Sequence, residues 1–82
     1  MDWKMCNGVL FFCHEDMMVS YNKDGSTLHR IEFNEREKSF GECLELVKDY
    51  PCLHDLLPGW MRRRKKMRSV KLINNLSDND TV

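Results

Sequence analysis

The sequence MMVSYNKDGSTLHRIEF, residues 17–33, carries the clearest folding signal in the chain. In its centre, Asn22 can open a type I turn and Gly25 can supply the left-handed residue of a three-residue hairpin loop with a bulge. The residues on either side of this turn include β-branched and aromatic side chains, which favour strands. The stretch therefore predicts two antiparallel strands, at about 17–22 and 26–33.

The register of this hairpin decides which side chains face the core. If residues 23–25 form the loop and every following pair of residues is matched in turn, Val19 lies opposite His29. A two-residue loop would instead place Val19 opposite Arg30. We expect the first register, because a one-residue slip sends the apolar set to the wrong side of the sheet. The expected apolar face then consists of Met17, Val19, Tyr21, Thr27, Ile31 and Phe33, with His29 at its margin.

Upstream of the hairpin lies a short apolar run that contains valine, leucine and two phenylalanines. This run predicts a strand at about 8–13 that is buried on both faces, and it completes a three-stranded antiparallel meander. A single helix cannot cover so many apolar side chains. We therefore expect the second face of the sheet to be roofed by the C-terminal helix or to form an interface, including that of a homodimer.

Downstream of the hairpin, apolar residues recur at helical spacing from Phe40 onward. Ser39 and Glu42 have the spacing of a capping box, and Pro51 ends the pattern. A helix is therefore predicted at about 40–50. The fold class that follows is α+β: a small three-stranded antiparallel β-meander packed against one helix, with a basic C-terminal helix.

The C-terminal part of the chain allows two interpretations. Good helix formers follow the Pro-Gly pair at 58–59 and predict a helix from about Trp60 to Asn75. The alternation at residues 70–72 leaves an edge strand as the alternative for that portion. In either case the chain predicts one small α+β domain over residues 1–76, followed by a flexible polar tail at 77–82.

Charge is segregated along a chain whose formal net charge is zero. Residues 1–60 contain 11 acidic and 6 basic side chains, a balance of −5, whereas residues 61–82 contain 7 basic and 2 acidic ones, a balance of +5. The molecule is therefore expected to be bipolar and able to meet partners of either sign.

The basic pole is the first candidate binding site. Its cations could contact several phosphates of DNA or RNA at once, and the neighbouring tryptophan could stack on an unpaired base. They could equally bind an acidic protein surface, or pair with the acidic part of the chain itself. The predicted site residues are Trp60, Arg62, Arg63, Arg64, Lys65, Lys66 and Arg68.

Four cysteines raise the question of disulfides. The N-terminal apolar run is too short for a signal peptide or a membrane span. This predicts a cytoplasmic chain, with the nucleus as the alternative in a eukaryote, and it predicts free thiols and no membrane association. The pairs Cys13-His14 and Cys52-Leu53-His54 have poor spacing for zinc. Cys52, His54 and Asp55 lack an oxyanion loop. We therefore expect no metal, no cofactor and no catalytic site.

These observations favour a small non-enzymatic binding protein that docks on a larger protein or protein complex as an inhibitor, adaptor or accessory subunit. The alternative is a nucleic-acid-binding regulator that uses a basic helix at 62–68 for phosphate contacts. Both hypotheses depend on whether the basic side chains are free or are neutralised within the chain.

Overall fold

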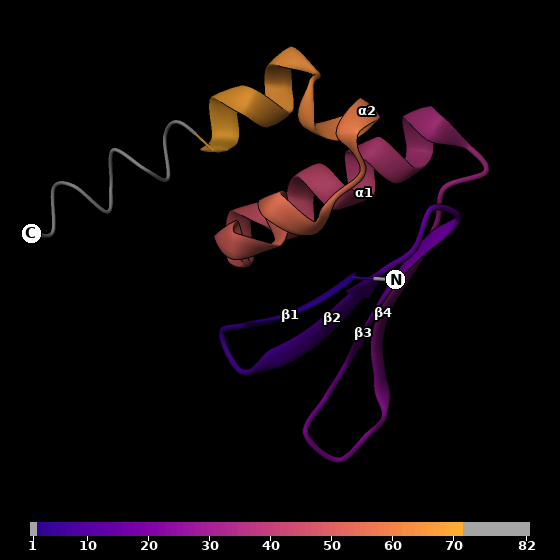
Figure 1. The fold of residues 1–82 in the computed structure, drawn as a ribbon, viewed down its shortest axis with the longest axis vertical. Coiled ribbons are helices and arrows are strands. Elements are labelled where there is room, and N and C mark those ends of the chain that lie inside the picture. The colour runs from indigo at the N-terminus through magenta and orange to yellow at the C-terminus, as the bar shows by residue number, and fades with distance from the viewer. Residues whose placement is uncertain (1, 72–82) are drawn as a thin grey trace, which may run out of the picture.

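The computed structural model describes residues 2–71, which form an antiparallel sheet with the described helices on one face (Figure 1). Four strands lie in the order β1-β2-β3-β4, namely β1 (Asp2–Cys6), β2 (Val9–Cys13), β3 (Met17–Tyr21) and β4 (Thr27–Glu32). They are followed by α1 (Arg36–Asp49), the 3-10 helix η1 (Pro51–Leu56) and α2 (Gly59–Arg62). The α+β class is confirmed, but the described sheet has one strand more than predicted.

The additional strand, β1, forms a hairpin with β2 through a two-residue turn. Asn7 and Gly8 both have positive φ values, 49° and 81°, which is the conformation that two-residue hairpins prefer. The Asn7 side chain donates a hydrogen bond to the carbonyl of Asp49 (3.0 Å), which ties this turn to the end of α1. The Asn-Gly pair is thus a hairpin turn rather than only the boundary of a strand.

The β3–β4 hairpin confirms the predicted loop but not the predicted register beyond it. The backbone N–H of Asn22 donates a hydrogen bond to the backbone carbonyl of Ser26 (2.8 Å) across the loop of residues 23–25, and Tyr21 pairs with Thr27. A bulge then shifts the register between Ser20 and Tyr21. As a result the rest of the hairpin has the register expected for a two-residue loop, with Val19 opposite Arg30 and Met17 opposite Glu32.

The bulge reverses the expected faces of β3 and of Thr27, whereas Ile31 and Phe33 are buried as predicted. The side chains that face the helices are Met18, Ser20, His29 and Ile31, whereas Met17, Val19 and Tyr21 lie on the other face. The buried Ser20 hydroxyl makes a 3.0 Å hydrogen bond with His29 Nδ1. Because β3 carries apolar residues on both faces, the apolar pattern could not distinguish the two registers.

Helix α1 begins four residues before the predicted start. Ser39 lies inside the helix, where its hydroxyl donates to the Arg36 carbonyl (3.1 Å), so it does not form a capping box with Glu42. The first turn is polar, and its first three residues are exposed, so it gives no apolar periodicity that could reveal it. The predicted end is correct, since α1 stops at Asp49 and Pro51 begins η1.

The helical layer and the inner face of the sheet share one core. Its fully buried members come from every layer and include Phe11, Met18, Cys43, Val47, Leu53, Leu57, Met61 and Met67. A disulfide joins Cys6 in β1 to Cys52 in η1, with Cα atoms 6.0 Å apart. The prediction of four free thiols is therefore wrong for this pair, while Cys13 and Cys43 are free and buried.

The chain after η1 is helical but not continuous. Residues 59–62 and 65–71 are helical, and residues 63–64 form a turn between them. The prediction of an unbroken helix from Trp60 is therefore wrong, and Val70 and Lys71 are helical rather than extended. Residues 72–82, including the predicted tail at 77–82, lie outside the described residues. Within residues 2–71, every helix is too short or too polar to cross a bilayer.

Candidate macromolecule-binding surfaces

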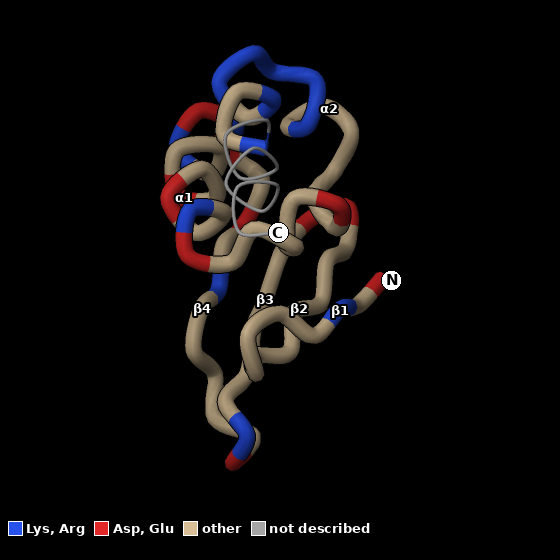
Figure 2. Tube along the Cα trace, turned by 90° about the vertical axis from the view of Figure 1, so that its left-hand side faces the viewer, with Lys and Arg blue, Asp and Glu red and all other residues tan. Residues whose placement is uncertain are grey.

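Five basic side chains form an exposed surface at one end of the molecule. Figure 2 shows a long run of Lys and Arg positions beside α2, at the end opposite to the β3–β4 hairpin. Each of the five side chains is exposed, and no acidic residue occurs between Asp55 and Asp78. We call this surface the basic cap; it consists of Arg62, Arg63, Lys65, Lys66 and Arg68.

The backbone that carries the basic cap is held by the core. Met61 and Met67, which flank most of the cap, are each 0% exposed. Arg64, between them, makes a bidentate ion pair with Glu37 of α1 (2.9 and 3.1 Å), and its guanidinium lies 4.0 Å from the centre of the Phe40 ring. The cap is therefore positioned rather than carried on a free arm.

Glycine 59 contributes to this arrangement. A Cβ atom at Gly59 would lie 2.8 Å from Nη1 of Arg63, so a larger residue there would displace that guanidinium. The arginine side chain can thus lie back over the first turn of α2 while remaining exposed. Gly59 therefore helps to set the direction of one cap cation.

The acidic part of the chain neutralises only part of the basic pole. Arg64 pairs with Glu37, and Lys71 pairs with Asp55 (3.0 Å). Arg64 lowers the pKa of the Glu37 carboxyl below its ordinary value, and Lys71 does the same to the pKa of Asp55. Among residues 2–71, none of the five cap side chains forms an ion pair. The predicted site residues thus differ in their surroundings. Arg64 anchors the segment to α1, whereas the five cap residues face solvent.

Trp60 occupies a different environment from the cap residues. Its ring is half-buried at the margin of the core and meets Phe33 edge-on, with the ring centres 6.4 Å apart. The Arg36 guanidinium lies 4.6 Å from the centre of the Trp60 ring. The Trp60 ring therefore already packs against residues of its own chain. Stacking of Trp60 on a nucleic-acid base stays a prediction.

A second surface is the sheet face that the described helices leave uncovered (Figure 1). The strand registers place a row of Trp3, Phe12, Val19 and Arg30 across this face, beside a second row of Met5, Leu10, Tyr21 and Thr27. Trp3 is 65% exposed and Met5 is 56% exposed. We call this surface the open face; it consists of these two rows with Met17 and Glu32. Contiguous apolar patches of this kind mark interaction sites.

Sequence reasoning missed the two most exposed apolar residues of the open face. Trp3 and Met5 belong to β1, which was not predicted, although the Asn7-Gly8 pair is a strong hairpin signal. The prediction of a sheet face beyond the reach of one helix agrees with this surface. Residues 65–71, however, lie on the side of α1 and do not roof it (Figure 1).

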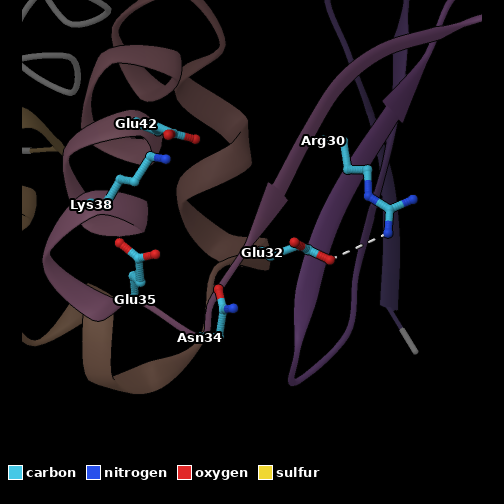
Figure 3. A pocket seen from close by; sticks show the side chains of 6 residues that line it. All are labelled: Arg30, Glu32, Asn34, Glu35, Lys38 and Glu42. Atoms are coloured by element: carbon cyan, nitrogen blue, oxygen red, sulfur yellow. Dashed lines mark hydrogen bonds and ion pairs between the residues drawn. The ribbon is translucent and has the colours of Figure 1, made fainter.

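A polar recess lies between β4 and the start of α1, shown close up in Figure 3. Its side chains are Arg30, Glu32, Asn34, Glu35, Lys38 and Glu42. Arg30 and Glu32 pair with each other at 3.3 Å. The lining contains charges of both signs but no cysteine, histidine or hydroxyl group, so its groups of the types that form covalent intermediates are the carboxylates and the Lys38 amine.

The cysteines that could carry chemistry are either bonded to each other or buried. Cys52 is bonded to Cys6 and cannot act as a nucleophile or zinc ligand in this state. Burial raises the pKa of Cys13 to about 11 and that of Cys43 to about 12, so both remain thiols at neutral pH. Within residues 2–71, no three potential metal ligands converge. Within residues 2–71, two of the cysteines therefore form the disulfide and the other two belong to the core.

No protein-family model, curated protein or solved structure is significantly similar to this chain. The two surfaces, the basic cap and the open face, are therefore the features from which its function can be inferred. The cap has a defined charge, and the open face has a defined apolar pattern.

Proposed function

We propose that this chain is a non-enzymatic binding protein whose basic cap docks on the negatively charged surface of a larger macromolecule, as an inhibitor, adaptor or accessory subunit. The observation that supports this proposal is a set of five exposed cations with no acidic partner among residues 2–71. The buried Met61 and Met67 hold their backbone in place, so binding orders less of the chain and costs less entropy than it would for a free arm.

The first partner class is an acidic surface of a protein or protein complex. Arginine guanidinium groups bind carboxylates in a bidentate manner, as Arg64 does with Glu37. An exposed ion pair contributes about 0.2–1 kcal/mol, so five of them supply at most about 5 kcal/mol. That corresponds to an affinity near the millimolar range. A single cap therefore needs additional contacts or a second cap for tight binding.

Nucleic acid is the second candidate, favoured by the absence of acidic residues from 56 to 77. Phosphates accept the same arginine and lysine contacts, and each contact releases counterions. Five contacts to a single strand predict a slope of about −3.5 for the logarithm of the binding constant against the logarithm of the salt concentration. This binding would read the backbone rather than the base sequence.

Two charge-matched variants test the proposal. The cap variant replaces three cap residues with glutamine: Arg62, Arg63 and Lys66. The control variant replaces three exposed lysines elsewhere with glutamine: Lys23, Lys38 and Lys48. Because both remove three positive charges, a difference between them reports the position of the charge rather than the net charge of the molecule.

The cap variant should bind heparin and single-stranded oligonucleotides more weakly and with a shallower salt slope, while the control variant binds as the natural chain does. A complex recovered from the native host should survive nuclease treatment if the partner is a protein, and dissociate if it is a nucleic acid. Equal weakening by the two variants would contradict the assignment to the cap.

The location of the chain is also a proposal. The sequence favours the cytoplasm, or the nucleus of a eukaryotic cell. The Cys6–Cys52 disulfide favours an oxidising compartment instead, because disulfide bonds are rare in the reducing cytosol and nucleus. The docking function depends on the cap and does not require either location.

A further inference from the structure

The open face has an internal order in which apolar and charged positions are separated. Its two rows run across the sheet, and in each row the three residues from β1, β2 and β3 are apolar or aromatic. The β4 side contributes Arg30, with its side chain 61% exposed, and Glu32, 59% exposed. The face is thus an apolar field with its charges confined to one edge strand.

We propose that two copies of this chain pack open face to open face, about a two-fold axis that runs between the sheets and parallel to the strands. This axis places β4 of one copy over β1 of the partner and β2 over β3. Phe12 then lies over the partner's Val19, and Leu10 lies over the partner's Tyr21. The centre of the interface is apolar in every row.

The same axis gives the charged edge a favourable partner. Arg30 and Trp3 stand at opposite ends of one row, so each arginine meets the partner's Trp3, and the contact occurs twice in the dimer. A guanidinium over an indole ring is a favourable cation–π pair. The chain already makes such a contact between Arg36 and Trp60, at 4.6 Å.

Other symmetric arrangements are less favourable. An axis perpendicular to the strands and through the middle row would set Arg30 against the partner's Arg30. Pairing of two β1 edges would have to accommodate Lys4, which points to the helical side and pairs with Asp55 (3.5 Å). Inward-pointing charges of this kind protect edge strands from pairing with another chain. Face-to-face packing avoids both problems.

The size of the face indicates a small interface. Four strands about 4.8 Å apart and five residues long form a face of roughly 19 by 17 Å. Two such faces remove on the order of 650 Å² in projection, and more when the relief of the side chains is included. Stable interfaces start at about 1,200 Å². We therefore expect a dissociation constant in the micromolar range rather than the nanomolar range.

The inference is tested by sedimentation equilibrium from about 1 to about 200 µM, which brackets a micromolar constant. The natural chain should shift from monomer to dimer across this range. Trp3→Glu should remain monomeric, because it places a carboxylate at the most exposed apolar position. The matched control is Leu28→Glu, an exposed apolar position in the groove between β4 and α1, which should dimerise as the natural chain does.

A third variant tests the arrangement itself. Arg30→Gln should raise the dissociation constant about 5- to 30-fold, because two exposed cation–π contacts are lost in each dimer. Circular dichroism at about 1 µM, below the dimerisation range, should show unchanged thermal unfolding for all three variants. A natural chain that stays monomeric at the highest concentration, or equal weakening by the variants at positions 3 and 28, would overturn the inference. Those outcomes leave the cap assignment intact, since its variants carry an unchanged open face.

Discussion

His54 is a buried ionisable group beneath the basic segment. It is 5% exposed, and neither ring nitrogen makes a hydrogen bond within residues 2–71. Burial, together with the nearby positive charge of Lys71, lowers the pKa of His54 below its ordinary value of 6.5. The folded chain therefore favours the neutral imidazole, whereas the unfolded chain takes up a proton near pH 6.5.

The sign of this shift predicts a loss of stability in mild acid. The contribution of His54 is fully present above pH 6.5 and is lost as the pH falls through the lower folded-state pKa. Urea denaturation should show a free energy of unfolding that decreases between about pH 7 and pH 5. His54→Leu should flatten this dependence. The exposed His14 provides the matched control, and a similar flattening by His14→Leu would contradict the role of burial.

Met67 tests whether the core holds the basic cap. The residue is fully buried although it lies between cap residues in the sequence. Met67→Ala should lower the free energy of unfolding by about 2–4 kcal/mol and weaken binding to heparin, with urea denaturation and affinity chromatography as measurements. Met5→Ala, at a position 56% exposed, should cost less than about 0.5 kcal/mol in dilute monomer. Unchanged heparin binding by the destabilised but folded variant would show that the cap needs no anchor.

At the level of elements, the disulfide joins the edge strand β1 to η1. Cys6 and Cys52 are separated by 46 residues, and closing a loop of this length in the unfolded chain corresponds to about 4 kcal/mol of stability on the chain-entropy account. Reduction should therefore lower the urea midpoint markedly. Alanine at both positions should give the same low midpoint with and without reductant. A natural chain insensitive to reductant would show that the bond adds nothing to the fold.

A thiol titration distinguishes this cystine from the two buried cysteines. With the Cys6–Cys52 bond intact, the folded chain should react slowly with a thiol reagent at pH 8, because Cys13 and Cys43 are buried and their pKa values are raised. Unfolding should expose two thiols, and reduction of the unfolded chain should expose four. Four reactive thiols without reductant would contradict the disulfide.

The sequence predicts most elements of the fold but not the pairing that assigns their faces. The turn at residues 23–25 is encoded locally by Asn22 and Gly25, and the end of α1 is encoded by Pro51. The bulge between Ser20 and Tyr21 is not visible in the pattern, because β3 has apolar residues on both faces. Strand β1 was missed since its alternation is broken by charge, with Lys4 on the inner face paired to Asp55.

The candidate site was predictable as a charged segment but not as a surface. Composition identifies the basic residues, yet it cannot separate Arg64, which binds Glu37, from neighbours that face solvent. That division depends on where the turn at 63–64 directs each side chain. The tertiary partner also removes Trp60 from the cap, since Phe33 and Arg36 lie far from it in sequence.

At the scale of the whole molecule, the cap and the open face serve different contacts. The cap lies at the end opposite to the β3–β4 hairpin (Figure 2), and a two-fold axis parallel to the strands keeps both caps at the same end of the dimer. One cap supplies only millimolar affinity. A polyanion that reaches both caps binds the second one intramolecularly, at a high effective concentration.

This arrangement predicts an avidity that depends on dimerisation. Single-stranded oligonucleotides of about 8 and about 40 nucleotides provide probes that fit one cap or span both. At concentrations where the natural chain is dimeric, fluorescence anisotropy should show at least about tenfold tighter binding to the long probe after correction for the number of sites. Trp3→Glu should bind the two probes with similar corrected affinity, because each monomer carries one cap. The cap variant should bind both probes more weakly than the natural chain does. A length preference that survives in the monomeric Trp3→Glu variant would show that the two surfaces act independently.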